Sequence, residues 1–276
     1  MTLVGFAAAE AHARAMVEAD ASDPSVLRGA GTRLWSHGEP RSKAALVLHG
    51  YTHTPTQVAA LAERFFALGY NVFAPRAPLH GLTTRRAHAR VVPGALRRYA
   101  AEAWTVTARL GSDAGVVGVS GGGVLATWLA TRTACRVRRL LVLAPFYRPH
   151  PRRVPPAAVA AMRVLYGAGL LPDRFDVRGH SYTALAQYLR IATEIRPVPG
   201  DGDLLRVAVA VSAREQSVDT RSVIAVPSAI AVAAGASLGA YVIPAAANVG
   251  HDIVTPAALG TSVDDLYSRY LALYEG

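Results

Sequence analysis

Short apolar runs rich in valine and leucine alternate along this chain with segments of helical patterning. Residues 44–48 (AALVL), 116–119 (VVGV) and 140–144 (LLVLA) are apolar almost throughout, which indicates strands buried on both faces. Strands that alternate with helices are typical of a parallel sheet covered on both sides. The chain is therefore expected to be α/β, with a mostly parallel central sheet. The expected strands are 32–35, 44–48, 70–74, 116–119, 140–144, 204–211 and 240–243.

Helix signals fill the segments between these strands. Thr54, Pro55 and Gln57 predict an N-cap, a first helical residue and a reciprocal cap partner, for a helix that ends at Gly69. Further helices are expected from Pro93 towards Leu110, from the end of 116–119 to about Ala134, and as a buried helix at 223–236. The first 20 residues predict an amphipathic helix, because acidic and basic residues interrupt their apolar part too early for a signal sequence.

One segment breaks the alternation of strands and helices. Residues 145–199 contain several prolines and two helical pieces, at 157–166 and 183–195, but no buried strand pattern. With 276 residues, 51% of them hydrophobic, the chain fits one large domain with an insertion. We therefore expect a core at 1–144 and 200–276, and a helical cap or lid at 145–199. Ligands of open α/β sheets bind beyond the carboxyl ends of the strands, so this cap would cover the site.

The net charge of +10 does not by itself indicate a nucleic-acid partner. Lys43 is the only lysine, and the arginines are spread along the chain rather than gathered in one arm. Two clusters, at 85–90 and 148–153, are either solvated loops or a rim that attracts anionic substrates or acidic lipid surfaces. The single Cys135 excludes an internal disulfide and a Cys-based zinc site. No apolar run reaches about 18 residues, so no membrane span is expected, and a cytoplasmic location is the default.

The stretch VVGVSGGG at 116–123 places one hydroxyl between an expected strand and an expected helix. Gly118, Ser120 and Gly122 give the spacing G-x-S-x-G of a nucleophile elbow, in which small residues let a strand and a helix pass closely. The plainer alternative is a glycine-rich turn with a surface serine. A phosphate-binding loop fits less well, because G-x-x-x-x-G-K-[ST] is absent.

A serine nucleophile needs a base and backbone donors for the oxyanion. His251 follows the last expected strand, where its loop can fold back over the sheet; the alternative is a surface histidine. The amide of Gly121, directly after Ser120, can supply one donor. The amide of Tyr51, in the loop after strand 44–48, can supply the other.

The segments LHGYTHTP, GYNVFAPRAPLHGL, GVSGG and VGHD, in this order, resemble an α/β-hydrolase of the carboxylesterase or monoacylglycerol-lipase-like kind. The resemblance runs from Ala44 to the C-terminus, with 145–199 matching only in position. It implies the α/β-hydrolase fold and a Ser-His-acid triad. One departure is Leu79-His80-Gly81, where relatives usually carry Gly-His-Gly.

The triad acid departs from the family pattern more seriously. Relatives usually place an aspartate after the penultimate strand with a valine three residues later; here Glu215 holds that place, ahead of Val218. Asp219 is the alternative acid, although as a helix N-cap it would have a purely structural role. We favour Glu215, because glutamate can orient a histidine as aspartate does.

The resulting hypothesis is a serine hydrolase that cleaves carboxylic esters, of short or medium acyl chains or monoacylglycerol-like, through an acyl-enzyme. Thioesterase, acyltransferase and peptidase activities share this apparatus, and a non-catalytic ligand-binding protein is the alternative of another class. No cofactor or metal is expected. His49 and His53 lie four residues apart but lack a carboxylate ligand, so His49 is expected to support the oxyanion loop instead.

Overall fold

A computed structural model describes residues 5–84, 86–199 and 203–276. Within these ranges, seven strands form one sheet in the order β1-β3-β2-β4-β5-β6-β7, parallel except for the antiparallel pair of β1 and β3. This confirms the mostly parallel sheet expected from the sequence. The strands are β1 (Arg33–Trp35), β2 (Arg41–Leu48), β3 (Asn71–Ala74), β4 (Gly111–Val119), β5 (Arg139–Leu143), β6 (Arg206–Ser212) and β7 (Ser237–Ile243).

Helices cover both faces of the sheet. The α-helices in the described ranges are α1 (Gly5–Ser22), α2 (Ala59–Ala67), α3 (Pro93–Thr107), α4 (Gly121–Ala130), α5 (Pro156–Leu165), α6 (Tyr182–Ala192), α7 (Thr220–Ala234), α8 (Pro256–Leu259) and α9 (Val263–Glu275). Short 3₁₀ turns are η1 (Pro55–Val58), η2 (Ala87–Arg90), η3 (Thr133–Cys135), η4 (Ala245–Ala247) and η5 (Gly260–Ser262). No helix of the described chain is long and apolar enough to span a bilayer.

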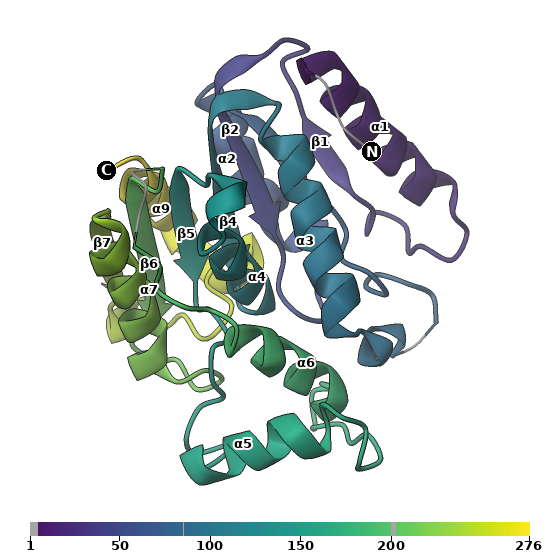
Figure 1. Ribbon diagram of the computed structural model, residues 1–276, viewed down its shortest axis with the longest axis vertical. Helices are drawn as coiled ribbons and strands as arrows, with labels where there is room; N and C mark the ends of the chain where they lie inside the picture. Colours follow the sequence, from purple (N-terminus) through teal and green to yellow (C-terminus); the bar gives the residue numbers. More distant parts are fainter. Residues whose placement is uncertain (1–4, 85, 200–202) are drawn as a thin grey trace.

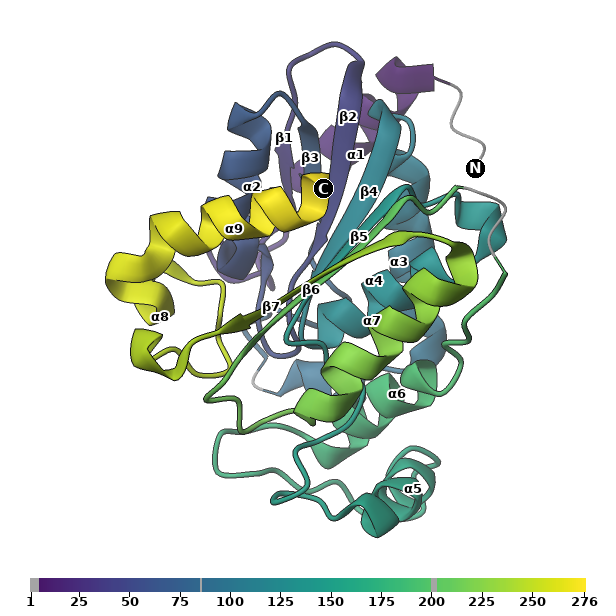
Figure 2. The same cartoon turned by 90° about the vertical axis from the view of Figure 1, so that its left-hand side faces the viewer.

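Successive residues of the central strands point to opposite faces, so the sheet has two separate cores. Leu46 and Leu48 of β2 pack in the core that includes α1, α3, α4 and α7. Ala45 and Val47, between and beside them, pack in the core that includes α2 and α9. Figure 2 shows these two sets of helices on opposite sides of the sheet. Burial on both faces explains why strand 44–48 contains no polar residue.

Helices α5 and α6 follow β5 and precede β6 along the chain, inside the segment 145–199, which we call the cap segment. Figure 1 shows both helices beyond the carboxyl end of the sheet, with α5 outermost. Helix α6 packs against α3 and α4 and buries Tyr188 and Leu189 among other residues. Helix α5 buries only Met162 of its own residues. The cap segment is therefore attached to the core mainly through α6.

Strand β4 begins earlier than the sequence pattern indicates. The expected strand is 116–119, but β4 starts at Gly111 and pairs with β2 from there, with Gly111 opposite Arg41 and Asp113 opposite Lys43. The first half of β4 contains polar residues, so it lacks the apolar pattern that indicates a buried strand. It still pairs with β2, because the ladder consists of backbone hydrogen bonds. Strand β7 likewise starts at Ser237, three residues before its expected beginning.

The predicted capping box at 54–57 is wrong. Thr54 makes no side-chain cap bond, residues Pro55–Val58 form the 3₁₀ turn η1, and α2 begins only at Ala59. The Gln57 side chain instead accepts the Gly50 N–H at 2.8 Å. The side chain of Gln57 thus bonds a loop N–H seven residues earlier instead of the N–H of the expected cap residue. A helix-start pattern in the sequence does not indicate such a contact.

The helix expected to be buried at 223–236 is present, but it is buried on one side only. Helix α7 buries only one side, through Val223, Pro227, Ile230 and Ala231, whereas Val232 is 82% exposed. It lies on the outside of the sheet face, so its outer side meets water despite its apolar composition.

Of the two arginine clusters, at 85–90 and 148–153, the first includes Arg85, which lies outside the described residues.

Candidate active site

Ser120 occupies the bend between β4 and α4. Its backbone has φ +50° and ψ −111°, a strained conformation for a residue with a side chain. Two hydrogen bonds maintain the bend: Ser120 N–H donates to Leu143 O at 2.9 Å, and Phe146 N–H donates to Ser120 O at 3.0 Å. The hydroxyl is thereby fixed at the carboxyl edge of the sheet, next to the first residues of the cap segment.

The flanking glycines are needed for close contact between backbones. A Cβ on Gly118 would lie 2.4 Å from Gly122 O, and a Cβ on Gly122 would lie 2.3 Å from Leu48 O. Both distances are far below van der Waals contact. The end of β4, the start of α4 and the end of β2 therefore approach one another in a way that only glycine at these two positions allows.

Three side chains from distant parts of the chain form one hydrogen-bonded row. The His251 Nε2 atom lies 3.0 Å from Ser120 Oγ, and its Nδ1 atom lies 2.7 Å from Glu215 Oε2. Asp219, the alternative acid, instead caps α7 by accepting the Arg221 N–H. The structure thus brings Glu215, and not Asp219, to the imidazole.

Glu215 has a fully buried side chain with hydrogen bonds to both oxygens. Its Oε1 accepts the Ser217 N–H at 2.5 Å and the Val218 N–H at 3.2 Å, which leaves Oε2 for His251. Burial by itself raises the pKa of this carboxyl, but the bonds from His251 and the two amides outweigh it and hold the pKa below the ordinary value. Glu215 is therefore ionised at neutral pH and accepts the Nδ1–H of His251.

The loop that carries His251 is tied to the end of β6 and to its own following turn. Ser212 Oγ donates to Val249 O at 2.5 Å. The Asp252 carboxylate accepts the N–H groups of Val254 and Thr255 on Oδ1 and the Thr255 hydroxyl on Oδ2. These bonds fix the backbone on both sides of His251, whose side chain remains 27% exposed.

The two expected oxyanion donors lie side by side. A Cβ built on Gly121 would lie 3.2 Å from Tyr51 N, and in the described chain neither amide donates to a protein acceptor. Residue Gly50, which precedes Tyr51, is held by two hydrogen bonds. Its N–H donates to Gln57 Oε1, and its carbonyl oxygen lies 2.9 Å from His49 Nδ1. The Ala77 N–H donates to His49 Nε2 at 3.0 Å, so Nδ1 carries the imidazole proton.

Known proteins were compared with this chain. The family model described as serine aminopeptidase, S33, matches residues 39–173. A metagenome-derived lipolytic enzyme of the LipS and LipT pair is 19% identical with a TM-score of 0.65, covering 90% of this chain and 98% of that one. The monoacylglycerol lipase of Paleococcus ferrophilus is 12% identical with a TM-score of 0.64, covering 88% and 97%. The chain has the α/β-hydrolase fold.

A soluble variant of the monoglyceride lipase of Saccharomyces cerevisiae shares the fold as well, at 12% identity and a TM-score of 0.59, covering 88% of this chain and 92% of the yeast chain. No curated protein matches the sequence. At these identities, the solved structures establish the fold of this chain, and the family model adds a sequence match over residues 39–173.

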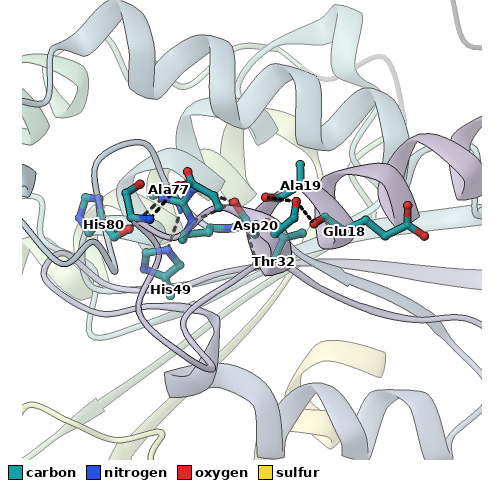
Figure 3. A network of polar contacts seen from close by, with 11 residues as sticks. Glu18, Ala19, Asp20, Thr32, His49, Ala77 and His80 are labelled. Atoms are coloured by element: carbon teal, nitrogen blue, oxygen red, sulfur yellow. Dashed lines mark hydrogen bonds and ion pairs between the residues drawn. The ribbon is translucent and has the colours of Figure 1, made fainter.

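The polar contacts of the loop that carries His49 and Tyr51 continue into the N-terminal part of the chain. Arg76, beside Ala77, forms an ion pair with Asp20 of α1 at 2.7 Å, and Asp20 also accepts the N–H and hydroxyl of Thr32. Figure 3 shows this network running from Asp20 and Thr32 to Ala77, His49 and His80. Burial by itself raises the pKa of Asp20, but the hydrogen bonds from Arg76 and Thr32 outweigh burial and bring the pKa below its ordinary value.

Two buried histidines in this network are expected to make the stability of the chain sensitive to acid. Burial lowers the pKa of His49 from 6.5 to about 3 and that of His80 to about 4. The folded chain keeps both rings neutral, whereas the unfolded chain binds a proton on each below pH 6.5. We therefore expect the free energy of unfolding to fall by about 1.4 kcal/mol per pH unit for each histidine as the pH drops from 6.5 towards 4.

Urea unfolding of the native chain and of His80→Phe at pH 7, 6 and 5 measures this effect. The variant keeps a ring of similar shape but cannot titrate, so its stability should depend less steeply on pH. Parallel stability profiles for the two proteins would contradict the assignment to His80.

A cavity of about 600 Å³ adjoins Ser120 and His251, between the core and the cap segment. Its apolar lining comes mostly from the cap segment, including Phe146, Met162 and Leu185. Its other lining residues are Tyr51, His53, Gln57, Val119, Pro149, Arg153, Val154, Asp176, Arg178, His180, Tyr182, Ser217 and Asp252. The described residues contain no group of three or more histidine, cysteine or acidic side chains arranged to hold a metal ion.

Sequence reasoning missed two contacts of this site. One is the Gln57 side chain at Gly50; the other is the Tyr51 hydroxyl, which accepts the Ser181 N–H at 3.2 Å and lies 2.9 Å from His88 Nδ1. The second contact joins the oxyanion loop to the start of α6 in the cap segment. An aromatic residue after His-Gly was the only sequence signal, and it identifies no partner.

Proposed function

We propose that this chain is a serine hydrolase that cleaves carboxylic esters through an acyl-enzyme, with Ser120, His251 and Glu215 as its triad. The observation that carries the proposal is the continuous row of hydrogen bonds from Ser120 Oγ through His251 to Glu215. Beside it lie the amides of Tyr51 and Gly121, which donate to no acceptor among the described residues. A nucleophile, a base, an orienting carboxylate and oxyanion donors are what acyl transfer requires.

The first half of the cycle forms the acyl-enzyme. His251 Nε2 takes the hydroxyl proton of Ser120 while Oγ bonds to the ester carbonyl carbon, and Glu215 stabilises the resulting imidazolium. The negative oxygen of the tetrahedral intermediate accepts hydrogen bonds from the Tyr51 and Gly121 amides. His251 then gives its proton to the departing alcohol oxygen as the C–O bond breaks.

The second half releases the acid. Water loses a proton to His251 as its oxygen bonds to the acyl carbon, and His251 returns that proton to Ser120 Oγ when the acyl–serine bond breaks. The fixed Gly50 peptide is important in both halves, because it holds the Tyr51 N–H in place without reorganisation.

The volume and lining of the cavity support, as substrates of this protein, esters of short or medium acyl chains or monoacylglycerol-like esters. About 600 Å³ suits a small to medium-sized ligand, and the cap segment supplies an apolar wall. Proteins named as lipolytic enzymes and monoacylglycerol lipases are among its structural neighbours. Because the family model is described as an aminopeptidase, amide hydrolysis is the second candidate.

Covalent labelling tests the proposed nucleophile. A fluorophosphonate probe should label the native chain but not the urea-unfolded chain, and peptide mass spectrometry should place the adduct on Ser120. A non-catalytic binding protein of this fold would not be labelled, and an adduct on another residue would refute the proposed triad.

A substrate panel tests the proposed reaction class. 4-Nitrophenyl esters of increasing acyl length should be hydrolysed with an optimum at short or medium chains, whereas aminoacyl 4-nitroanilides should be turned over far more slowly. The reverse preference would make the protein a peptidase on the same apparatus.

A further inference from the structure

The cap segment carries an excess of positive charge close to the cavity. Within residues 145–199 there are eight arginines, at positions 148, 152, 153, 163, 174, 178, 190 and 196, against three acidic residues, Asp173, Asp176 and Glu194. Two of these arginines, Arg153 and Arg178, line the cavity beside Ser120. These two guanidinium groups can bind a ligand only if other groups of the protein do not already occupy their N–H donors.

Arg153 lies on a segment that is fastened to the loop carrying the acid. Pro149 forms a bridge with Val218, the His150 N–H donates to Ser217 O at 3.0 Å, and the Asp219 N–H donates to Arg148 O at 3.0 Å. These bonds join the start of the cap segment to residues 217–219, directly after Glu215. The backbone of Arg153 is therefore built into the wall next to the proposed triad.

The side chain of Arg153 is fastened as well, but only in part. Its Nε–H donates to Gln216 O at 2.6 Å. In the described part of the chain no hydrogen bond or ion pair uses its two terminal nitrogens, nor any nitrogen of the Arg178 guanidinium. A guanidinium that is held at Nε and open at its end presents a planar pair of donors, the geometry that suits a carboxylate or phosphate.

The acidic groups that line the cavity do not pair with these arginines, because their oxygens are bonded to other groups. Asp176 accepts the N–H groups of Arg178 and His180 on Oδ1 and lies 2.9 Å from His180 Nδ1 through Oδ2. Both oxygens of Asp252 are bonded to residues 254 and 255. Among the charged side chains that line the cavity in the described part of the chain, the donors left open for a ligand are therefore those of the two arginines.

We propose that this site takes esters that carry an anionic group, a carboxylate in the first instance, and that Arg153 is the residue that binds it. The inference rests on the proposed function, since it names the substrate class of the same site. Apolar lining from Phe146, Met162 and Leu185 contacts the hydrocarbon part of such an ester, while the terminal nitrogens of Arg153 bind the charged end.

Two matched pairs of substrates test the proposal with the full chain. The first pair carries the charge on the acyl side: 4-nitrophenyl hemiadipate and 4-nitrophenyl hexanoate. The second pair carries it on the alcohol side: 3-(butanoyloxy)benzoate and its methyl ester. After correction for spontaneous hydrolysis, we expect the carboxylate member of at least one pair to have the higher kcat/KM, and the preference to shrink at high salt.

Arg153→Gln should lower kcat/KM for the preferred carboxylate ester about tenfold more than for its neutral partner, with the difference mostly in KM. Arg163→Gln is the matched control, because Arg163 lies on α5 in the same cap segment but does not line the cavity. It removes the same charge and should leave the preference intact.

Three outcomes would overturn the inference. Neutral esters hydrolysed as fast as both carboxylate esters would refute the substrate class and leave the proposed function standing. Equal losses for charged and neutral esters in Arg153→Gln would mean that Arg153 only positions the Gln216 loop. No hydrolysis of any ester, together with no fluorophosphonate labelling, would refute the proposed function, and the inference would fall with it.

Discussion

Replacing Glu215 with glutamine is expected to lower kcat by about four orders of magnitude while the chain stays folded. Glu215 Oε1 accepts two backbone N–H groups, and Oε2 accepts the Nδ1–H of His251. A glutamine has only one oxygen. If that oxygen keeps the two amides, its NH₂ group faces Nδ1 and favours the tautomer with the proton on Nε2, which cannot accept the Ser120 proton.

Asp219→Asn is the control for this experiment. Asp219 accepts the Arg221 N–H as the N-cap of α7, and asparagine caps helices about as well as aspartate. We therefore expect kcat to change by less than about twofold. Kinetics on a 4-nitrophenyl ester and thermal unfolding of both variants provide the measurement. A large loss in Asp219→Asn with normal activity in Glu215→Gln would reverse the assignment of the acid.

Gly122→Ala is expected to reduce kcat/KM by at least about a hundredfold and to lower the Tm. The new Cβ would lie 2.3 Å from Leu48 O and 2.5 Å from His49 O, so the start of α4 would have to move away from β2. This movement would separate the Gly121 amide from the Tyr51 amide. In an unobstructed helix the same change would stabilise the chain by up to about 1 kcal/mol, so the sign of the Tm shift reports the clash.

Gly250→Ala is the matched control. Gly250 precedes His251, yet a Cβ there would meet no atom within 4 Å and its φ is not positive. Near-normal activity and Tm are expected, measured as for Gly122→Ala. Wild-type activity in Gly122→Ala would show that the elbow does not need glycine at this position.

Much of this site is encoded locally, and such features could be expected from the sequence. The bend at Ser120 is indicated by residues 116–122, where a strand pattern stops, a hydroxyl follows and small residues surround it. The predictions that were wrong concerned burial and cap partners, as at Gln57 and α7, because a helix pattern does not say what the rest of the fold places beside it.

The acid illustrates a harder case. Glu215 and Asp219 are four residues apart, and both follow β6. Which one faces His251 depends on the path of the backbone after Ser212, where the turn donates the N–H groups of Ser217 and Val218 to Glu215 itself. The position of Val218 in the sequence favoured Glu215, but only this turn brings its carboxylate to the imidazole.

The sequence by itself determined the alternation of strands and helices, the two-sided burial of the sheet and the bend at Ser120, because each depends on neighbouring residues and on side-chain periodicity. The tertiary structure decided which groups meet: Ser120 with His251 across 131 positions, Gln57 with Gly50, the Tyr51 hydroxyl with Ser181, and Arg153 with Gln216. The physical reason is that a hydrogen bond needs its two atoms within about 3 Å, and only the packed sheet and cap segment bring these distant parts of the chain so close.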